Sequence, residues 1–506
     1  MVRVRTYVGR SCPNVPPLRD VVWSRPTDEV LRATAPEVSD SQLACVVAKL
    51  HHGEPVHMVF FGSSVTAGIR CKHTKERSVN FPQQVAQLIE SRIPQANLTL
   101  DVYGYPGASP NFLRACEGTL MRSNVADIYV IEMTDNLSDG YMGVGVSVEG
   151  LMSAVRQRAP LAALMLLAPV PQRCVRAIKR MKPFQHIPLD DASTLRILHE
   201  DCYSNHSVAA SFEDVGSAHN VATVSARKLV RDELFRHPNQ ARKIMGRLHY
   251  DAVHPSGSGH WQLAVALEYA LLGPLAGERV SMPHKGACQP PRVGALERFN
   301  IFAPRRPSTG SMVCALGEDL KRYVLRASGW HYKVEYNAQG LPKPGYIAEQ
   351  PGATLDLCHR PDLKRTAAGQ PSYRATVAWS LGYLMSYEHM GQMRGECVSS
   401  ESSCTCGARV FNAHWRLPVS QPHISRLKLQ IRYAQRGPSG PLVPEAALAS
   451  DPATAAAACP CKIRLTLLNA SDTDAHKFKL VSLMSGFYTG TIVSDAVGWA
   501  SRYGIM

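Results

Sequence analysis

The chain has 506 residues, of which 45% are apolar and 19% charged, so its composition excludes a wholly disordered protein. That length allows two to four domains. The longest apolar run, residues 161–170, is too short to span a bilayer, and we expect no membrane-spanning helix. The net charge of +15 is uneven, with a balance of +4 over residues 1–272 and +11 over residues 273–506.

The excess of basic residues raises the question of a polyanionic partner. The chain has no block of five or more Lys and Arg residues and no recognisable DNA-recognition helix or zinc finger, so we expect no nucleic acid partner. Two explanations stay open. Either the surface of the second half is suited to binding an acidic polysaccharide, or its arginines reflect the codon usage of a GC-rich genome.

Fourteen cysteines exceed what is usual for a cytosolic protein, and their even number favours disulfides. Sequence alone does not reveal the pairing. Free buried thiols stay open, as does a zinc ion held by the C-x-C pairs Cys404/Cys406 and Cys459/Cys461. The cysteine content favours the secretory pathway or the extracellular space, but residues 1–20 lack the apolar core of a signal peptide, so the localisation stays open.

Short apolar runs alternate with helical patterns between residues 56 and 272. This alternation predicts a parallel sheet with crossover helices, and therefore an α/β domain over residues 51–272 after an N-terminal extension, 1–50. The predicted strands are 56–61, 98–103, 128–132, 161–167 and 221–225. The predicted helices are 81–93, 111–120, 146–158 and 259–272.

The composition changes at residue 273, where prolines accumulate among Gly and Arg and predict a linker over 273–312. Apolar runs separated by turn residues follow, and they predict a β-sandwich accessory domain over 313–490. Within it, 436–459 reads as a mobile insertion, and 491–506 forms a C-terminal tail. The predicted strands are 322–327, 353–358, 373–387, 427–433, 462–468 and 477–483.

The first segment that carries chemistry joins an apolar strand to Gly62-Ser63-Ser64 and a turn of small residues. A serine at the carboxyl end of a strand, before a helix, lies where α/β sheets bind ligands. A helix N-terminus also favours a developing negative charge. The segment is not a G-x-S-x-G turn, because Thr66 replaces the second Gly. Alone, it also fits an ordinary polar turn.

The second segment contains Asp251 and His254, followed by Pro255. An Asp three residues before a His can fix the tautomer of the imidazole and stabilise its protonated form. Pro255 restrains His254 toward an extended backbone ahead of the next helix. Taken alone, such a pair is common in loops that have no catalytic role.

In this order, and about 190 residues apart, the two segments resemble the first and last motifs of the SGNH, or GDSL-type, hydrolase family. Residues 62–68 match G-D-S-[L/V]-T-x-G, and residues 251–255 match D-x-x-H-P. After the second strand, Tyr105-Pro-Gly107 resembles the glycine block of the family. After the third strand, residues 130–136 resemble its G-x-N-D block.

The resemblance covers residues 55–272 and has departures. Ser63 stands where the first motif has Asp, and Thr134 and Leu137 stand where the third has Gly and Asp, although Asn136 is retained. The second half also resembles the C-terminal module of some plant and algal members, especially over residues 382–391.

The resemblance implies a flavodoxin-like, three-layer α/β fold and a metal-independent serine mechanism without a cofactor. Ser64 would attack an ester carbonyl, His254 would move the proton, and Asp251 would orient His254. The oxyanion would be held by the backbone N–H groups of Ser64 and Gly107 and by the side-chain amide of Asn136.

The leading function is therefore a serine esterase that removes acyl groups, often acetyl, from a carbohydrate or another small ester. A second hypothesis is an acyltransferase that uses the same triad to acylate a polysaccharide hydroxyl, and the sequence does not separate the two. A third is a glycan-binding protein without catalysis, which the intact Ser64, Asp251 and His254 disfavour. The oligomeric state is not predicted.

Aromatic residues of the second half bear on glycan binding. At strand spacing they either form a sugar-stacking surface or pack inside the domain, and packing is the default. These residues are Trp330, Tyr332, Trp379, Tyr383 and Tyr387.

Overall fold

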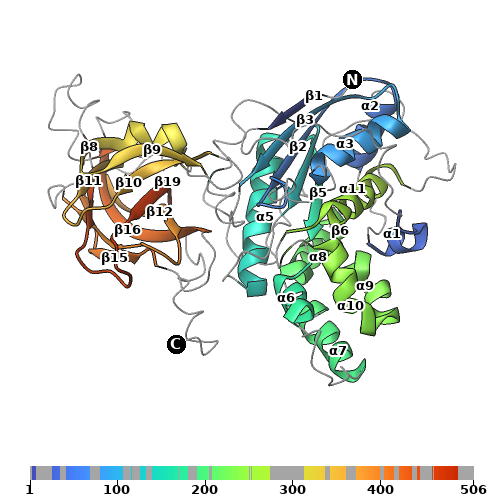
Figure 1. Ribbon diagram of the computed structural model, residues 1–506. Helices are drawn as coiled ribbons and strands as arrows, with labels where there is room; N and C mark the ends of the chain where they lie inside the picture. Colours follow the sequence, from blue (N-terminus) through green and yellow to red (C-terminus); the bar gives the residue numbers. More distant parts are fainter. Residues whose placement is uncertain are drawn as a thin grey trace. The chain divides into compact units, whose positions relative to one another are not determined.

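The computed structural model describes the chain as two compact units, which Figure 1 draws in ribbon form. The α/β unit contains the described residues from 3 to 273 except Cys116, and the β-rich unit contains Cys116 and residues from 313 to 487. No helix in this part of the chain is long and apolar enough to cross a membrane. The described residues are 3–6, 25–34, 41–68, 80–105, 116, 126–132, 140–168, 170–180, 191–203, 208–249, 251, 254–273, 313–336, 342–359, 372–398, 404–414, 421–435, 442–444, 459 and 461–487.

The sheet of the α/β unit has the strand order β1-β3-β2-β4-β5-β6, and all its neighbouring strands are parallel. Strands β4 and β5 are buried along their whole length, as expected for a parallel sheet covered on both faces. The bounds are β1 Arg3–Thr6, β2 Pro55–Gly62, β3 Asn97–Gly104, β4 Ile128–Glu132, β5 Ala163–Ala168 and β6 Ala222–Ser225. The predicted α/β fold with a parallel sheet is confirmed.

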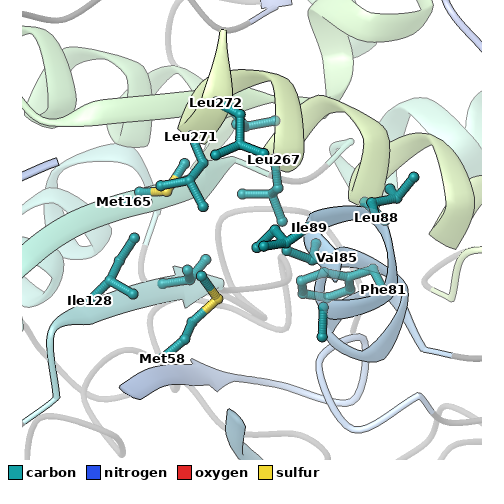
Figure 2. Packing of buried hydrophobic residues seen from close by; sticks show 14 of the residues in the cluster. Met58, Phe81, Val85, Leu88, Ile89, Ile128, Met165, Leu267, Leu271 and Leu272 are labelled. Carbon is teal, nitrogen blue, oxygen red and sulfur yellow. The ribbon is translucent and has the colours of Figure 1, made fainter. Parts of the chain in front are cut away.

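Helices cover both faces of this sheet. On one face, Figure 2 shows side chains of α3 and α11 packing toward Met58, Ile128 and Met165 of the strands. On the other face, Phe61 stacks against Tyr129, because side chains alternate along a strand. The helices are α1 Asp28–Thr34, α2 Ser41–His51, α3 Phe81–Arg92, α5 Gly140–Arg158, α6 Gln172–Arg180, α7 Asp191–Ile197, a π-helix Leu198–Cys202, α8 Val208–His219, α9 Ala226–Arg236, α10 Ala241–Leu248 and α11 Gly257–Leu272.

Part of the region predicted as an N-terminal extension belongs to this core. Leu43, Val46 and Leu50 of α2 are buried in the same cluster as the sheet and α11, and β1 pairs with β3 at the sheet edge. Residues 41–51 therefore form a packed layer of the α/β unit rather than a separate extension. The predicted helix 111–120 and the predicted linker 273–312 lie almost wholly outside the described residues.

The β-rich unit consists of two antiparallel sheets that share one core. The larger has the order β14-β16-β12-β19-β10-β9, with β17 on β16 and β7 on β19, and the smaller has the order β15-β13-β18-β11-β8. Trp379 of the larger sheet and Ile463 of the smaller lie in one buried cluster, so the predicted sandwich is confirmed. The strands are β7 Val313–Leu316, β8 Val324–Ser328, β9 His331–Tyr336, β10 Pro342–Ala348, β11 Thr354–His359, β12 Ser372–Met385, β13 Gln392–Cys397, β14 Cys404–Thr405, β15 Arg409–Asn412, β16 Gln421–Gln435, β17 Leu442–Pro444, β18 Cys461–Leu467 and β19 Phe478–Phe487.

Most of the aromatic residues singled out in the sequence pack inside the unit. Trp330, Trp379 and Tyr383 are 3%, 0% and 3% exposed, so they are not available to stack on a sugar ring. Tyr332 is half-buried, and Tyr387 is exposed. Strand β17 lies inside the stretch predicted as a mobile insertion, where it pairs with β16.

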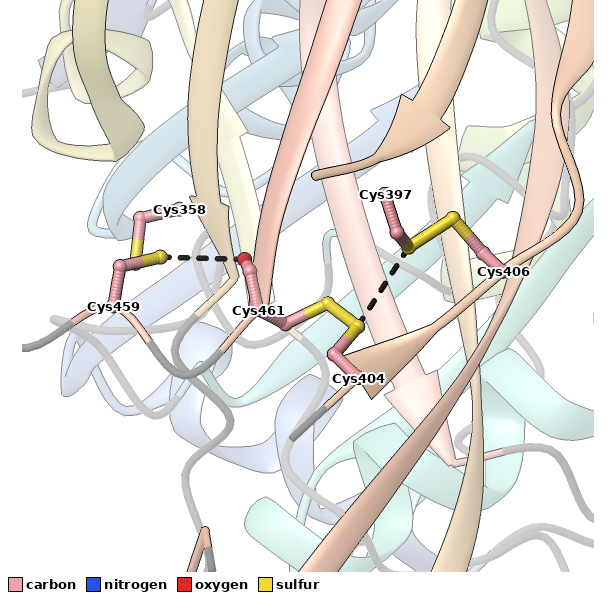
Figure 3. Close-up of a disulfide and its surroundings, with 6 residues drawn as sticks. All are labelled: Cys358, Cys397, Cys404, Cys406, Cys459 and Cys461. Carbon is pink, nitrogen blue, oxygen red and sulfur yellow. Dashed lines mark hydrogen bonds between the residues drawn. A yellow bond between two sulfur atoms is a disulfide. The ribbon is translucent and has the colours of Figure 1, made fainter. Parts of the chain in front are cut away.

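The described cysteines are paired in disulfides, and none of them is free. Figure 3 shows Cys358–Cys459, Cys397–Cys406 and Cys404–Cys461 close together in the β-rich unit. The C-x-C pairs that suggested zinc are therefore engaged in disulfides. Further bonds join Cys174 to Cys202 and Cys116 to Cys314.

Candidate active site

The structure brings Ser64, His254 and Asp251 into one hydrogen-bonded chain. The Ser64 Oγ lies 3.0 Å from His254 Nε2, and His254 Nδ1 lies 2.8 Å from Asp251 Oδ2. The backbone N–H of His254 donates to the other carboxylate oxygen, Oδ1, at 2.8 Å. Because the carboxylate accepts from both the ring and the backbone of one residue, it fixes the orientation of the ring. An Nδ1–H bonded to Asp251 leaves the Nε2 lone pair for Ser64.

The three residues come from the ends of elements that are distant in sequence. Ser64 follows β2 at the carboxyl edge of the sheet, while Asp251 and His254 precede α11. The Ser256 side chain caps α11 by accepting from Gly259 N at 3.2 Å, and Ser256 N donates to Leu248 O at 2.8 Å. This double attachment holds the segment that carries His254.

The side chains of Ser64, His254 and Asp251 differ in solvent exposure. Ser64 is 5% exposed, whereas the side chains of His254 and Asp251 are 16% and 31% exposed. The imidazole and the carboxylate are therefore partly accessible to solvent, whereas the Ser64 hydroxyl belongs to a buried residue.

The Ser64 loop, residues 62–68, makes close contacts at two glycines, one in the loop and one at the end of β3. A Cβ on Gly62 would lie 1.8 Å from Thr66 Oγ1, and a Cβ on Gly104 would lie 2.3 Å from Ala67 N. Tyr105 N also donates to Gly62 O at 2.9 Å, so the end of β3 is bonded to the start of the loop. A larger residue at either glycine would push the loop away from the sheet.

A buried carboxylate, which the sequence analysis missed, lies beneath this loop. Glu132 at the end of β4 is 1% exposed and accepts hydrogen bonds from Ser63 and Thr66. Burial raises the pKa of Glu132, and the bonds from Thr66 and Ser63 oppose that rise. The only sequence signal for Glu132 is an acid that ends an otherwise apolar strand, and the resemblance over residues 130–136 points to Asn136 instead.

A second buried titratable group lies near His254. Burial, with a smaller contribution from the charge of His254, lowers the pKa of His260 to about 3. His260 Nδ1 accepts from Phe81 N at 3.4 Å. This imidazole therefore stays neutral near pH 7 and does not place a second positive charge beside His254.

Two of the predicted oxyanion donors, Gly107 and Asn136, lie outside the described residues, and their roles stay predictions. The third donor, the Ser64 N–H, belongs to a loop in which the other backbone N–H groups mostly donate hydrogen bonds. Among the described residues, none accepts a hydrogen bond from the Ser64 N–H.

A mainly apolar pocket adjoins the loop at the carboxyl ends of β4 and β5. Val65 and Pro255, the residues that follow Ser64 and His254, form part of its wall. Glu132 and His249 are its titratable lining residues. The remaining lining residues are Leu167, Val170, Ala226, Leu229, Val230, Leu248, Gly259, Gln262 and Leu263.

Comparison with known proteins identifies relatives by fold alone. No family model matches the chain, and no curated protein matches it. Two solved structures, both of a two-domain esterase active on acetylated mannans, match it with a TM-score of 0.55 and 14% sequence identity. They cover 91% and 93% of this chain and 99% and 100% of their own chains, and one was co-crystallised with mannopentaose. The chain therefore shares a two-domain fold with these esterases over nearly its whole length.

Proposed function

We propose that this protein is an SGNH-type serine esterase that removes acetyl groups from a carbohydrate. The observation that carries the proposal is the hydrogen-bonded chain from Ser64 through His254 to Asp251. It supports nucleophilic catalysis because a serine hydroxyl needs an adjacent base, held in one tautomer, to become reactive at neutral pH. The fold shared with esterases active on acetylated mannans supports an acetylated polysaccharide as the substrate.

The proposed mechanism assigns each step to one of these three residues. His254 Nε2 takes the proton of Ser64 Oγ as Oγ bonds to the acetyl carbonyl carbon. The protonated imidazole then gives this proton to the sugar oxygen as the ester C–O bond breaks, which releases a hydroxyl and leaves an acetyl group on Ser64. A water molecule repeats the two steps, so that acetate leaves and Ser64 regains its proton. Asp251 stabilises the imidazolium in both stages.

The oxyanion of each tetrahedral intermediate would be bound by the Ser64 N–H, the Gly107 N–H and the Asn136 amide. The free Ser64 amide of the described loop supports the first of these assignments. Loss of a single donor of this kind typically costs about 10²–10³ in rate.

The proposal is tested with p-nitrophenyl acetate and acetylated mannan as substrates for the wild type and Ser64→Ala. We expect Ser64→Ala to lower kcat by about 10⁶-fold, since the nucleophile is lost. Ser91→Ala on α3, whose hydroxyl donates to Leu88 O in its own helix, is the matched control and should leave kcat unchanged. Equal rates for Ser64→Ala and the wild type would exclude Ser64 as the nucleophile.

Product analysis with an added polysaccharide acceptor tests the acyl acceptor. Release of free acetate as the main product supports the esterase. If a labelled acetyl donor passes its acetyl group to the polysaccharide instead, the protein is an acyltransferase that uses the same residues.

A further inference from the structure

The contacts of Glu132 converge on the segment that carries Ser64. Its Oε2 accepts from Ser63 N at 3.0 Å, from Thr66 N at 3.1 Å and from Thr66 Oγ1 at 2.6 Å. Its Oε1 accepts from Ser63 Oγ at 3.1 Å. One carboxylate oxygen thus joins two backbone amides that are three residues apart, and Ser64 lies in the arc between them.

From this arrangement we propose that Glu132 is a positioning residue for the reaction, which holds the Ser64 loop so that Ser64 Oγ faces His254. The inference rests on the proposed function. Glu132 does not contact the reacting hydroxyl itself, and it acts through Ser63 and Thr66. Because Glu132 ends β4, the neighbour of β2, the anchor is built into the rigid sheet.

The hydrogen bonds of the loop also decide which amide is left for the oxyanion. The N–H groups of Ser63 and Thr66 are taken by Glu132, and Val65 N donates to Ser63 Oγ at 3.3 Å. Ala67 N donates to Ser63 O at 3.0 Å. Within the described residues, the Ser64 N–H has no acceptor. Glu132 therefore closes the turn while keeping that donor available.

Residue 63, at which the chain departs from the G-D-S motif, contacts the Glu132 carboxylate directly. Ser63 stands where the G-D-S motif has an acid, and its hydroxyl and amide both bond to Glu132. Ser63 and Thr66 are fully buried, so an Asp at 63 beside Glu132 would place two carboxylates in one enclosed space. Among the described residues, the carboxylate that bonds to Ser63 and Thr66 comes from β4, and a carboxylate at position 63 should replace it only when Glu132 is removed.

The experiment compares Glu132→Ala, Glu132→Gln and the double variant Glu132→Ala/Ser63→Asp with the wild type. The readouts are kcat and KM for p-nitrophenyl acetate, the rate at which a fluorophosphonate labels Ser64, and the unfolding midpoint. A misplaced nucleophile slows chemistry more than binding, so Glu132→Ala should lower kcat and the labelling rate about 100-fold and leave KM within threefold. Glu132→Gln keeps the shape and one acceptor oxygen, and should retain most of the rate.

The double variant is the decisive arm, since it returns a carboxylate to the loop. We expect it to regain at least about tenfold in kcat over Glu132→Ala, whereas Ser63→Asp alone should be impaired by the like charge of Glu132. Glu149→Ala is the control, because Glu149 is also 1% exposed but bonds to His219 on α8. It should lower the unfolding midpoint without changing kcat per folded molecule.

The positioning role is overturned if Glu132→Ala and Glu149→Ala lower the unfolding midpoint alike and both keep the wild-type kcat and labelling rate. It is equally overturned if Ser63→Asp restores the midpoint of Glu132→Ala but none of its rate. Should Glu132→Ala fail to fold, Thr66→Val removes only the 2.6 Å bond and should still slow labelling several-fold. If the wild type hydrolyses no acetyl ester, the proposed function fails, but fluorophosphonate labelling still tests the position of Ser64.

Discussion

The Ser64 loop and the smaller sheet of the β-rich unit each enclose a carboxylate, but the partners differ in kind. Glu132 is 1% exposed, and the donors that bond to it are the neutral groups of Ser63 and Thr66. Asp356 is 2% exposed and accepts from the Arg464 guanidinium at 2.7 and 3.0 Å, with Lys462 Nζ 3.0 Å away.

The same functional group consequently shifts its pKa in opposite directions. Burial raises the pKa of Glu132, whereas the hydrogen bonds from Arg464 lower the pKa of Asp356. In the β-rich unit, the positive charges of Arg464 and Lys462 offset the cost of burying Asp356, as a structural ion pair requires. A carboxylate that is bonded to neutral donors costs more free energy to bury than one paired with a cation. Such a group fits a position whose role is to hold a particular geometry rather than to stabilise the fold. The kind of hydrogen-bond partner, rather than the depth of burial, therefore distinguishes these two carboxylates.

A third carboxylate, Asp251, tests whether acids of the two units differ in role. Asp251→Asn keeps the shape of the side chain but no longer favours the Nδ1–H tautomer of His254, so kcat for p-nitrophenyl acetate should fall by about 10⁴-fold. The matched control is Asp356→Asn, which changes an acid to the same amide in the β-rich unit and should keep the wild-type kcat. A similar loss of kcat in both variants would show that carboxylates of the two units do not differ in role.

The fold of the α/β unit follows closely from local sequence patterns. The run predicted at 128–132 is β4 Ile128–Glu132, and the predicted strand 56–61 lies within β2 Pro55–Gly62, because apolar runs bounded by turns specify buried parallel strands. Strand β9 was missed although residues 332–336 alternate apolar and polar side chains, because the run is short and is not marked by a longer apolar run.

The meeting of Ser64, Asp251 and His254 in one hydrogen-bonded arrangement was predictable, because the motifs tie each residue type to a position. Glu132 had no such signal. Its partners lie 66 and 69 residues earlier in the chain, and they meet it only because β2 and β4 pair in the sheet. A single acid at the end of an apolar strand has many structural explanations, and a contact of this range is set by the tertiary fold.

The disulfide between Cys404 and Cys461 is expected to affect stability but not catalysis. Cys404 and Cys461 are buried, and their disulfide spans a sequence separation of 57 residues within the β-rich unit. Replacing both with Ala should lower the free energy of unfolding of that unit by about 3–4 kcal/mol, because the unfolded chain regains the freedom of a long loop. Calorimetry of the full chain measures this change. The kcat per folded molecule should stay at the wild-type value, and a parallel loss of kcat would contradict the division of roles between the units.

The smallest effect is the pH dependence of the Asp356 ion pair. Since the folded-state pKa of Asp356 lies below its ordinary value, the pair stabilises the protein above about pH 5, and this contribution is lost as the pH falls through the folded-state pKa. Asp356→Asn should therefore lower the free energy of unfolding by about 1–3 kcal/mol at pH 7. Urea unfolding of the two proteins should converge as the pH approaches 2. A stability difference of equal size at pH 7 and pH 2 would mean that packing around residue 356, and not its charge, holds the two strands together.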